Sequence, residues 1–439
     1  MIKRILYTLL IMFPVVASAQ INTDRVMAIG RNALYFEDYV LSIQYFNQVI
    51  NAKPYLSDPY FYRGLAKINL DDFQGAESDC SEAIERNPFV VSAYQVRGLA
   101  RIQQNNFAGA IEDYTKALEF DPENIGVWHN MALCRIRQED YKGAKNDLDK
   151  LIAISPRYTK AYLMRGEVDL KQKDTLAAEK DFGKAIEIDR YDADTWASRA
   201  ILRLQQQRYK DAEADFDHAI RLSTRNSGVY INRALARYHQ NNLRGAMSDY
   251  DIALDIDPNN FIGHYNRGLL RAQVGDDNRA IQDFNFVIEM EPDNMMAIFN
   301  RGLLLDQTGD YKGAIKDYST VINEYPNFLL GYQYRAQARR KIGDVKGADA
   351  DEFKVLKAQL DKQNGVDPNK QTADNTENNK TRKKSDKNMN NYRKIVVADN
   401  EEGEEKYKSD YRGRVQDKNV NIVPQPMFVL TYYESGGSS

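Results

Sequence analysis

The sequence predicts an all-α protein built from ten copies of one helical hairpin. Shifting the segment 91–124 along the chain in steps of 34 residues gives ten copies in register, from residue 23 to about residue 362. In each copy, apolar residues recur at helical spacing before and after a polar break, and seven copies carry proline at position 32, where the second helix must end. A hairpin of this length leaves one apolar side uncovered, so neighbouring copies are expected to stack into a solenoid.

Small and large side chains occupy fixed positions in the copies. Position 8 is glycine or alanine in all ten copies, and position 20 is alanine in nine, with Ser42 in the first. Positions 4 and 24 mostly carry aromatic rings, as at Tyr94 and Tyr114. This pattern predicts that small residues let the two helices of each hairpin approach closely.

These positions resemble the tetratricopeptide repeat family, whose period is the same. The resemblance covers residues 23 to about 362, with local departures such as Arg190 and Thr224 in place of the helix-ending proline. It implies a right-handed α-solenoid of helix-turn-helix repeats whose inner groove commonly holds peptides. We expect the repeat array to span residues 20–362.

Arginine at position 7 and aspartate at position 23 occur together in eight copies. The first copy has neither, and the fourth has Asp147 opposite Met131. This co-occurrence predicts a partly buried ion pair, formed within a hairpin or across to its neighbour. The pairs include Arg97 with Asp113, Arg233 with Asp249, Arg267 with Asp283, and Arg301 with Asp317. Leaving the aspartate unpaired by Arg233→Ala is expected to cost about 3–5 kcal/mol. The alternative is a row of arginines that captures acidic ligands.

The resemblance also implies which residues line the groove, mainly positions 2, 5, 9, 12 and 13 of each copy. The candidate peptide-binding residues are Phe61, Leu65, Leu99, Leu133, Leu235, Tyr238, Tyr265, Leu269, Phe299 and Leu303. Leucine or isoleucine at position 9 recurs in seven copies, and such an apolar stripe usually marks a binding surface. The alternative is that neighbouring helices cover it.

The sequence gives no sign of catalysis. None of the four histidines (His129, His218, His239 and His264) has metal-ligand spacing, and no glycine-rich phosphate loop follows a strand pattern. We therefore expect no enzyme activity, cofactor or metal. A net charge of −3 argues against nucleic acid as a partner. The two cysteines, Cys80 and Cys134, fall at core positions two copies apart, too far for a disulfide.

Residues 1–19 are expected to be a secretory signal peptide. Lys3 and Arg4 precede the apolar run Ile5–Val16, and Ala17–Ala19 has the small residues of a cleavage site. The run is too short for a comfortable membrane span. The mature chain would begin at Gln20 or Ile21, outside the cytoplasm in the periplasm or outer envelope. The alternative is a retained anchor helix.

The end of the chain changes in composition. Residues 363–391 are polar, contain no aromatic residue and are expected to be a disordered linker. The tail 392–439 contains two strand-like segments, 393–398 and 427–433. One hypothesis is that the tail, through residues 422–433, folds back into the groove of its own array; the other is that it adds a strand to a partner's sheet.

Together these features predict a non-enzymatic protein-binding scaffold in the bacterial cell envelope. A second hypothesis is a glycan- or cell-wall-binding protein for nutrient capture at the outer membrane, with Tyr238, Tyr265 and Phe299 stacking on sugars. A third is an assembly factor of an envelope secretion machine.

Overall fold

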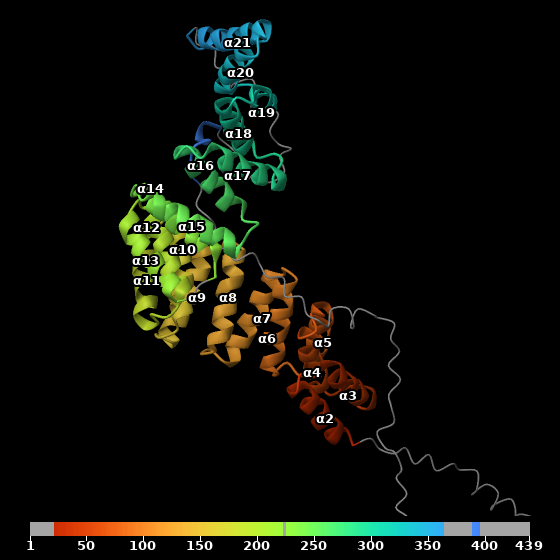
Figure 1. The fold of residues 1–439 in the computed structure, drawn as a ribbon. Coiled ribbons are helices and arrows are strands. Elements are labelled where there is room, and N and C mark those ends of the chain that lie inside the picture. Colours follow the sequence, from red (N-terminus) through yellow and green to blue (C-terminus); the bar gives the residue numbers. More distant parts are fainter. Residues whose placement is uncertain (1–21, 223–224, 364–388, 396–439) are drawn as a thin grey trace, which may run out of the picture. The chain divides into compact units, whose positions relative to one another are not determined.

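The computed structural model describes residues 22–222, 225–363 and 389–395 (Figure 1). The chain divides into two compact units, and the boundary between Ala178 and Glu179 falls inside α11 (Thr175–Ile188). We call the unit before this boundary the N-terminal unit and the unit after it the C-terminal unit.

The N-terminal unit is a series of helical hairpins. Its complete helices are α2 (Thr23–Tyr35), α3 (Tyr39–Ala52), α4 (Asp58–Ile68), α5 (Phe73–Arg86), α6 (Val91–Gln103), α7 (Phe107–Phe120), α8 (Ile125–Arg137), α9 (Tyr141–Ile154) and α10 (Thr159–Lys171). Each helix packs on the next one along the chain from α2 to α10, and the first helices of successive hairpins also touch, as in α4 with α6 and α6 with α8.

The C-terminal unit repeats this arrangement. Its helices after α11 are α12 (Ala193–Gln205), α13 (Tyr209–Arg221), α14 (Ser227–His239), α15 (Leu243–Ile256), α16 (Phe261–Gln273), α17 (Asp277–Met290), α18 (Met295–Thr308), α19 (Tyr311–Glu324), α20 (Leu329–Lys341) and α21 (Val345–Gln363). A short 3₁₀ turn, η2 (Met389–Asn391), begins the last described segment, residues 389–395. First helices again touch, as in α12 with α14 and α16 with α18. In each unit, the first helices of the hairpins lie next to one another, and we call the surface that they form the first-helix face.

The all-α hairpin array is confirmed for the described residues. Nine first helices begin at the residue that the 34-residue repeat predicts, and α4 begins one residue later, at Asp58. The described residues contain no strand, and none of their helices is both long and apolar enough to cross a membrane.

The turn inside each hairpin has one geometry. In the segment 91–124, Asn105 adopts a left-handed backbone with φ of 60°, and the side chain of Asn106 accepts a hydrogen bond of 3.1 Å from the Gly109 N–H at the start of α7. Such a cap satisfies a backbone donor that the helix itself leaves unpaired. The left-handed residue and the capping side chain recur at Asp71 and Asp72 of the preceding copy. This repeated geometry keeps the turn the same length in both copies.

The close approach of the two helices explains the small residue at position 8. A Cβ atom added to Gly98 would lie 2.7 Å from the ring of Tyr114, well inside van der Waals contact. The fully buried ring therefore packs directly on the backbone of α6.

The predicted terminal segments mostly lie outside the described residues. This applies to the signal peptide 1–19 and to the segments 422–433 and 427–433. The expected linker 363–391 meets described elements at both ends, because Gln363 ends α21 and Met389–Asn391 form η2. In the expected strand 393–398, the described residues 393–395 are not in a strand.

Candidate functional site: the arginine–aspartate row and the first-helix face

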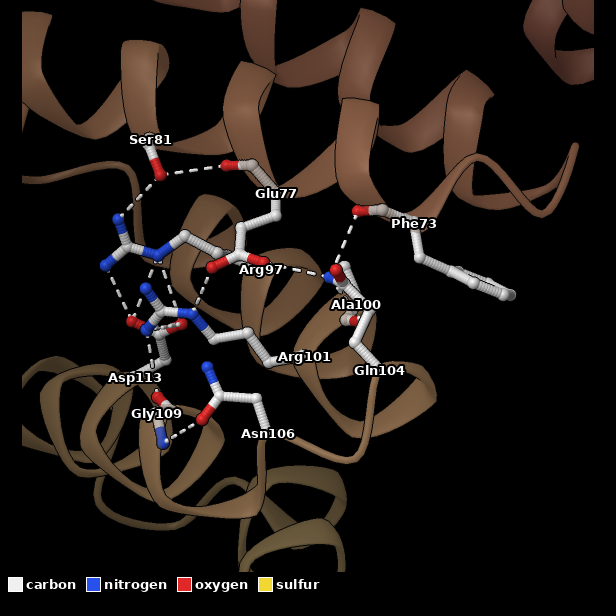
Figure 2. Close-up of polar contacts among 10 residues, drawn as sticks. All are labelled: Phe73, Glu77, Ser81, Arg97, Ala100, Arg101, Gln104, Asn106, Gly109 and Asp113. Atoms are coloured by element: carbon white, nitrogen blue, oxygen red, sulfur yellow. Dashed lines mark hydrogen bonds and ion pairs between the residues drawn. The ribbon is translucent and has the colours of Figure 1, made fainter. Parts of the chain in front are cut away.

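The Arg97 guanidinium joins two consecutive hairpins (Figure 2). Its Nη2 donates to Asp113 Oδ1 at 2.6 Å within the same hairpin, and its Nη1 donates to the Ser81 hydroxyl of the preceding hairpin at 3.1 Å. Asp113 is buried. Of the two arrangements that the sequence left open for the arginine–aspartate pair, the one within a hairpin is observed here, and the contact with the preceding hairpin goes to a different side chain, Ser81.

The other predicted pairs have the same geometry. The Nη2–Oδ1 distance is 2.6 Å for Arg233 and Asp249. It is 2.8 Å for Arg267 and Asp283, and 2.7 Å for Arg301 and Asp317. Each of these arginines also donates to position 25 of the preceding copy, to Asp217, Asp251 and Asn285 respectively. We call these repeated pairs the arginine–aspartate row. The row links consecutive hairpins through polar side-chain contacts, in addition to their apolar packing.

A second arginine, at position 11 of the repeat, also contacts the buried aspartate, which the sequence analysis did not predict. Arg101 Nη1 lies 2.9 Å from Asp113 Oδ2, and Arg101 Nε lies 2.8 Å from Glu77 of the preceding hairpin (Figure 2). Although burial raises the pKa of Glu77, hydrogen bonds from Arg101 and Gln104 hold it below its usual value. Arginine recurs at position 11 in six copies, and this recurrence could have predicted the contact. The aspartates and glutamates of the array itself occupy these arginines, which favours a structural role over capture of acidic ligands.

The fourth copy lacks the first arginine of this arrangement. Met131 occupies position 7, and buried Asp147 keeps only the contact with Arg135 among the described residues, at 2.8 Å. Burial raises the pKa of Asp147 to about 6, against the attraction of Arg135. The folded protein therefore binds this proton at a higher pH than the unfolded chain, so the N-terminal unit loses stability as pH rises from about 4 through 6.

We expect Met131→Arg to lower the pKa of Asp147 and to stabilise the N-terminal unit by about 1–2 kcal/mol at pH 7. The new guanidinium would contact the carboxylate as Arg97 contacts Asp113. At pH 4 the gain should vanish, because Asp147 is then protonated in the parent protein. Urea unfolding at pH 4 to 8 measures this effect, with Met131→Gln as a control of similar length and no charge. An equal gain at pH 4 and pH 7 would contradict the explanation.

In the N-terminal unit, the predicted binding residues form a partly open stripe. Leu99 on α6 is 39% exposed, whereas Phe61, Leu65 and Leu133 are half-buried. They lie on α4, α6 and α8. Because α4 contacts α6 and α6 contacts α8, the four residues follow one another along the first-helix face. We call these four residues the N-terminal stripe.

In the C-terminal unit, the residues 389–395 lie on the first-helix face (Figure 1). The main-chain carbonyl of Tyr392 accepts two hydrogen bonds, from the Tyr265 hydroxyl at 2.8 Å and from Asn300 Nδ2 at 2.6 Å. Its ring meets Phe299 edge to face, with centroids 4.9 Å apart. Through these contacts, residues 389–395 bind both α16 and α18, although they lie far from these helices in the sequence.

Three of the predicted binding residues are therefore not exposed. Tyr265 and Phe299 pack in one cluster with Met389 and Tyr392, and Leu235 packs in another with Ile395. All three are buried, whereas Tyr238, Leu269 and Leu303 are half-buried. Tyr265 and Phe299 thus have no free ring face for a sugar in this structure. Of the alternatives that the sequence left open, a covered stripe is what the structure has at these three residues, where residues 389–395 and the neighbouring helices pack on them.

The histidines and cysteines have packing roles. His264 bonds Asp283 and the Pro258 carbonyl, each at 3.0 Å, and stacks on Phe286. The other histidine rings each meet an aromatic ring: His129 meets Tyr158, His218 meets Trp196, and His239 meets Tyr209. Cys80 and Cys134 are buried, and burial raises the pKa of each thiol to about 12. Among the described residues, no group of histidine, cysteine and acidic side chains is arranged to hold a metal ion.

Comparisons with known proteins agree with this geometry. A family model described as "TPR repeat" matches residues 98–134. Two models described as "Tetratricopeptide repeat" match 125–158 with 159–192, and 198–261 with 265–327. No curated protein matches the sequence.

Several solved structures are similar to this chain. A tetratricopeptide repeat protein from Parabacteroides merdae is 21% identical over 57% of this chain and 98% of its own, with a TM-score of 0.45. PilF from Pseudomonas aeruginosa is 20% identical over 46% of this chain and 92% of its own, with a TM-score of 0.41. YrrB, described as a TPR protein with an unusual peptide-binding site, is 20% identical over 42% of this chain and 95% of its own, with a TM-score of 0.35.

Proposed function

Because the chain belongs to the tetratricopeptide repeat family, we propose that it is a non-enzymatic scaffold that binds an extended segment of a partner protein along its first-helix face. Tetratricopeptide repeats are protein-interaction modules.

One observation carries the choice of surface. In the C-terminal unit, the first-helix face holds a chain segment through one main-chain carbonyl and several apolar side chains. The N-terminal stripe presents the equivalent positions partly exposed, with Leu99 at 39%. Partly exposed apolar positions in a row suit the alternate side chains of an extended peptide.

The test is retention of a partner by matched variants of the mature chain, which begins at Gln20 in the proposal. We expect the double substitution Leu99→Glu and Leu133→Glu to abolish retention of a partner from bacterial envelope extracts, because it places two charges in an apolar contact. Lys116→Glu, at a site whose side chain is 56% exposed on α7, is the control and should leave retention intact. Equal retention by the two proteins would refute binding at the N-terminal stripe.

The envelope location rests on residues 1–19, with Lys3 and Arg4 before an apolar run and Ala17–Ala19 at its end. N-terminal sequencing of the exported protein is expected to start at Gln20 or Ile21. An uncleaved chain in the cytoplasm would refute this part of the proposal. A glycan as the ligand is a distinct outcome: retention would then survive protease treatment of the extract and be lost after glycosidase treatment.

A further inference from the structure

We propose that residues 389–395 are an intramolecular ligand of the C-terminal unit, and that they mark the class of peptide this face binds. That class is a segment that forms a short 3₁₀ turn, with an aromatic residue flanked by large apolar residues three positions before and three positions after it. A partner of this kind would displace residues 389–395. This inference rests on the proposed function and adds the specificity and the regulation of one of its two faces.

The contact recognises the main chain of the ligand. Tyr265 and Asn300 come from successive first helices, α16 and α18, and both donate to the same carbonyl of Tyr392. Both donors are buried, at 4% and 6% exposure. A main-chain carbonyl is present in every peptide, so this pair of donors can hold other sequences in the same register. Asn300 Nδ2 also donates to the Met296 carbonyl at 2.8 Å, so the side chain is held in place by its own helix, and the carbonyl of another peptide could accept the same two bonds.

The side chains supply the specificity. Met389, Tyr392 and Ile395 are buried, whereas the intervening Asn391 and Arg393 are exposed. The anchors are three residues apart, as expected for a segment that begins with a 3₁₀ turn, in which residues i and i+3 lie on the same side. Met389 packs in the cluster that contains Tyr265 and Phe299, and Tyr392 meets Phe299 edge to face.

The third anchor extends the contact along the face. Ile395 packs in the cluster that contains Leu204 and Leu235, on α12 and α14. The segment therefore runs from α18 toward α12, against the order of the repeats. A competing peptide must present its anchors in the same direction.

Attachment to the chain favours the internal ligand. Residues 364–388 connect the end of α21 to the segment, so its binding is intramolecular. A tethered ligand acts at an effective concentration on the order of millimolar when its linker is short, and a free peptide must compete against it. The contact consists of three apolar anchors and two hydrogen bonds, few enough for exchange with a partner that makes further contacts. The C-terminal unit is thus closed until such a partner arrives.

The experiment uses a fluorescent peptide of residues 388–396 and measures its binding by anisotropy. The proteins compared are the mature chain and its variant with Tyr392→Ala and Ile395→Ala, which removes two anchors of the internal ligand. We expect the peptide to bind the variant at least about ten times more tightly, because the tethered competitor is gone. Adding Tyr265→Phe, which removes only the hydroxyl, should weaken binding about tenfold. A peptide with Tyr392→Ala should not bind, whereas a peptide with Lys394→Ala, an exposed position, should bind as the parent does.

Equal binding by the mature chain and the variant, or no binding by either, would overturn the inference. A concentration-dependent dimer of the mature chain that the variant does not form would also overturn it, since the segment would then bind a second copy. Each of these results would contradict only the role assigned to residues 389–395. The proposed function has a separate test, because partner retention that depends on the N-terminal stripe would persist.

Discussion

Replacing Arg301 with alanine is expected to destabilise the C-terminal unit by about 3–5 kcal/mol, because it leaves a buried carboxylate without its cation. The Asp317 side chain is 4% exposed and receives hydrogen bonds from Arg301 Nε and Nη2, at 2.8 and 2.7 Å. Position 11 of this copy is Leu305, so the second arginine of the row is missing here. Among the described residues, Arg301 is the only cation paired with Asp317.

The matched comparison is Arg233→Ala, for which the sequence alone suggested the same large loss. The structure revises that value downward. Asp249 keeps Arg237 Nη1 at 2.9 Å after Arg233 is removed, so we expect a loss of about 1–2 kcal/mol.

Urea unfolding measures the loss caused by each substitution, and hydrogen exchange locates it, in α18 and α19 for Arg301→Ala and in α14 and α15 for Arg233→Ala. Arg279→Ala is the control: its side chain is 68% exposed and its ion pair with Asp276 spans 3.5 Å, so no measurable change is expected. A double substitution of Arg301 and Asp317 isolates the energy of the pair itself. The explanation fails if Arg301→Ala costs no more than Arg233→Ala.

Replacing Phe299 with alanine is expected to cost about 3–5 kcal/mol, as for other large-to-small changes in a packed core. The ring is fully buried. Its centroid lies 5.0 Å from that of Phe328, 5.6 Å from Tyr318 and 4.9 Å from Tyr392. These partners come from α19, the loop after it and residues 389–395, so one cavity would loosen several elements at once.

Hydrogen exchange can locate this effect as well as measure it. Protection should fall in α18–α20 and in residues 389–395, whereas the N-terminal unit should be unchanged, because each repeat of a solenoid contacts mainly its neighbours. Phe299→Leu, which keeps most of the apolar volume, should cost less than about 1.5 kcal/mol. A loss spread evenly over both units would contradict this local account.

Much of the candidate site could be predicted because the chain repeats its own pattern. Arg97 and Asp113 are sixteen residues apart, and the same separation recurs for Arg301 and Asp317, so one sequence provides several independent observations of one contact. The acceptor at position 25 was not predicted, because its residue type changes from Ser81 to Asp217 and Asn285 while its role stays the same. Only the packing of consecutive hairpins shows that these different side chains occupy one place.

The sequence by itself determined the hairpin, its length, its ion pairs and its stacking, because each depends on contacts that recur every 34 residues. The tertiary structure alone decided which part of the first-helix face is covered. Tyr392 follows Tyr265 by 127 residues and Asn300 by 92, and no periodic pattern connects them. A contact made once, over a long separation, leaves no repeated signal in a single sequence. It is held by the packing of Met389, Tyr392 and Ile395 on the first-helix face and by the two hydrogen bonds to the Tyr392 carbonyl.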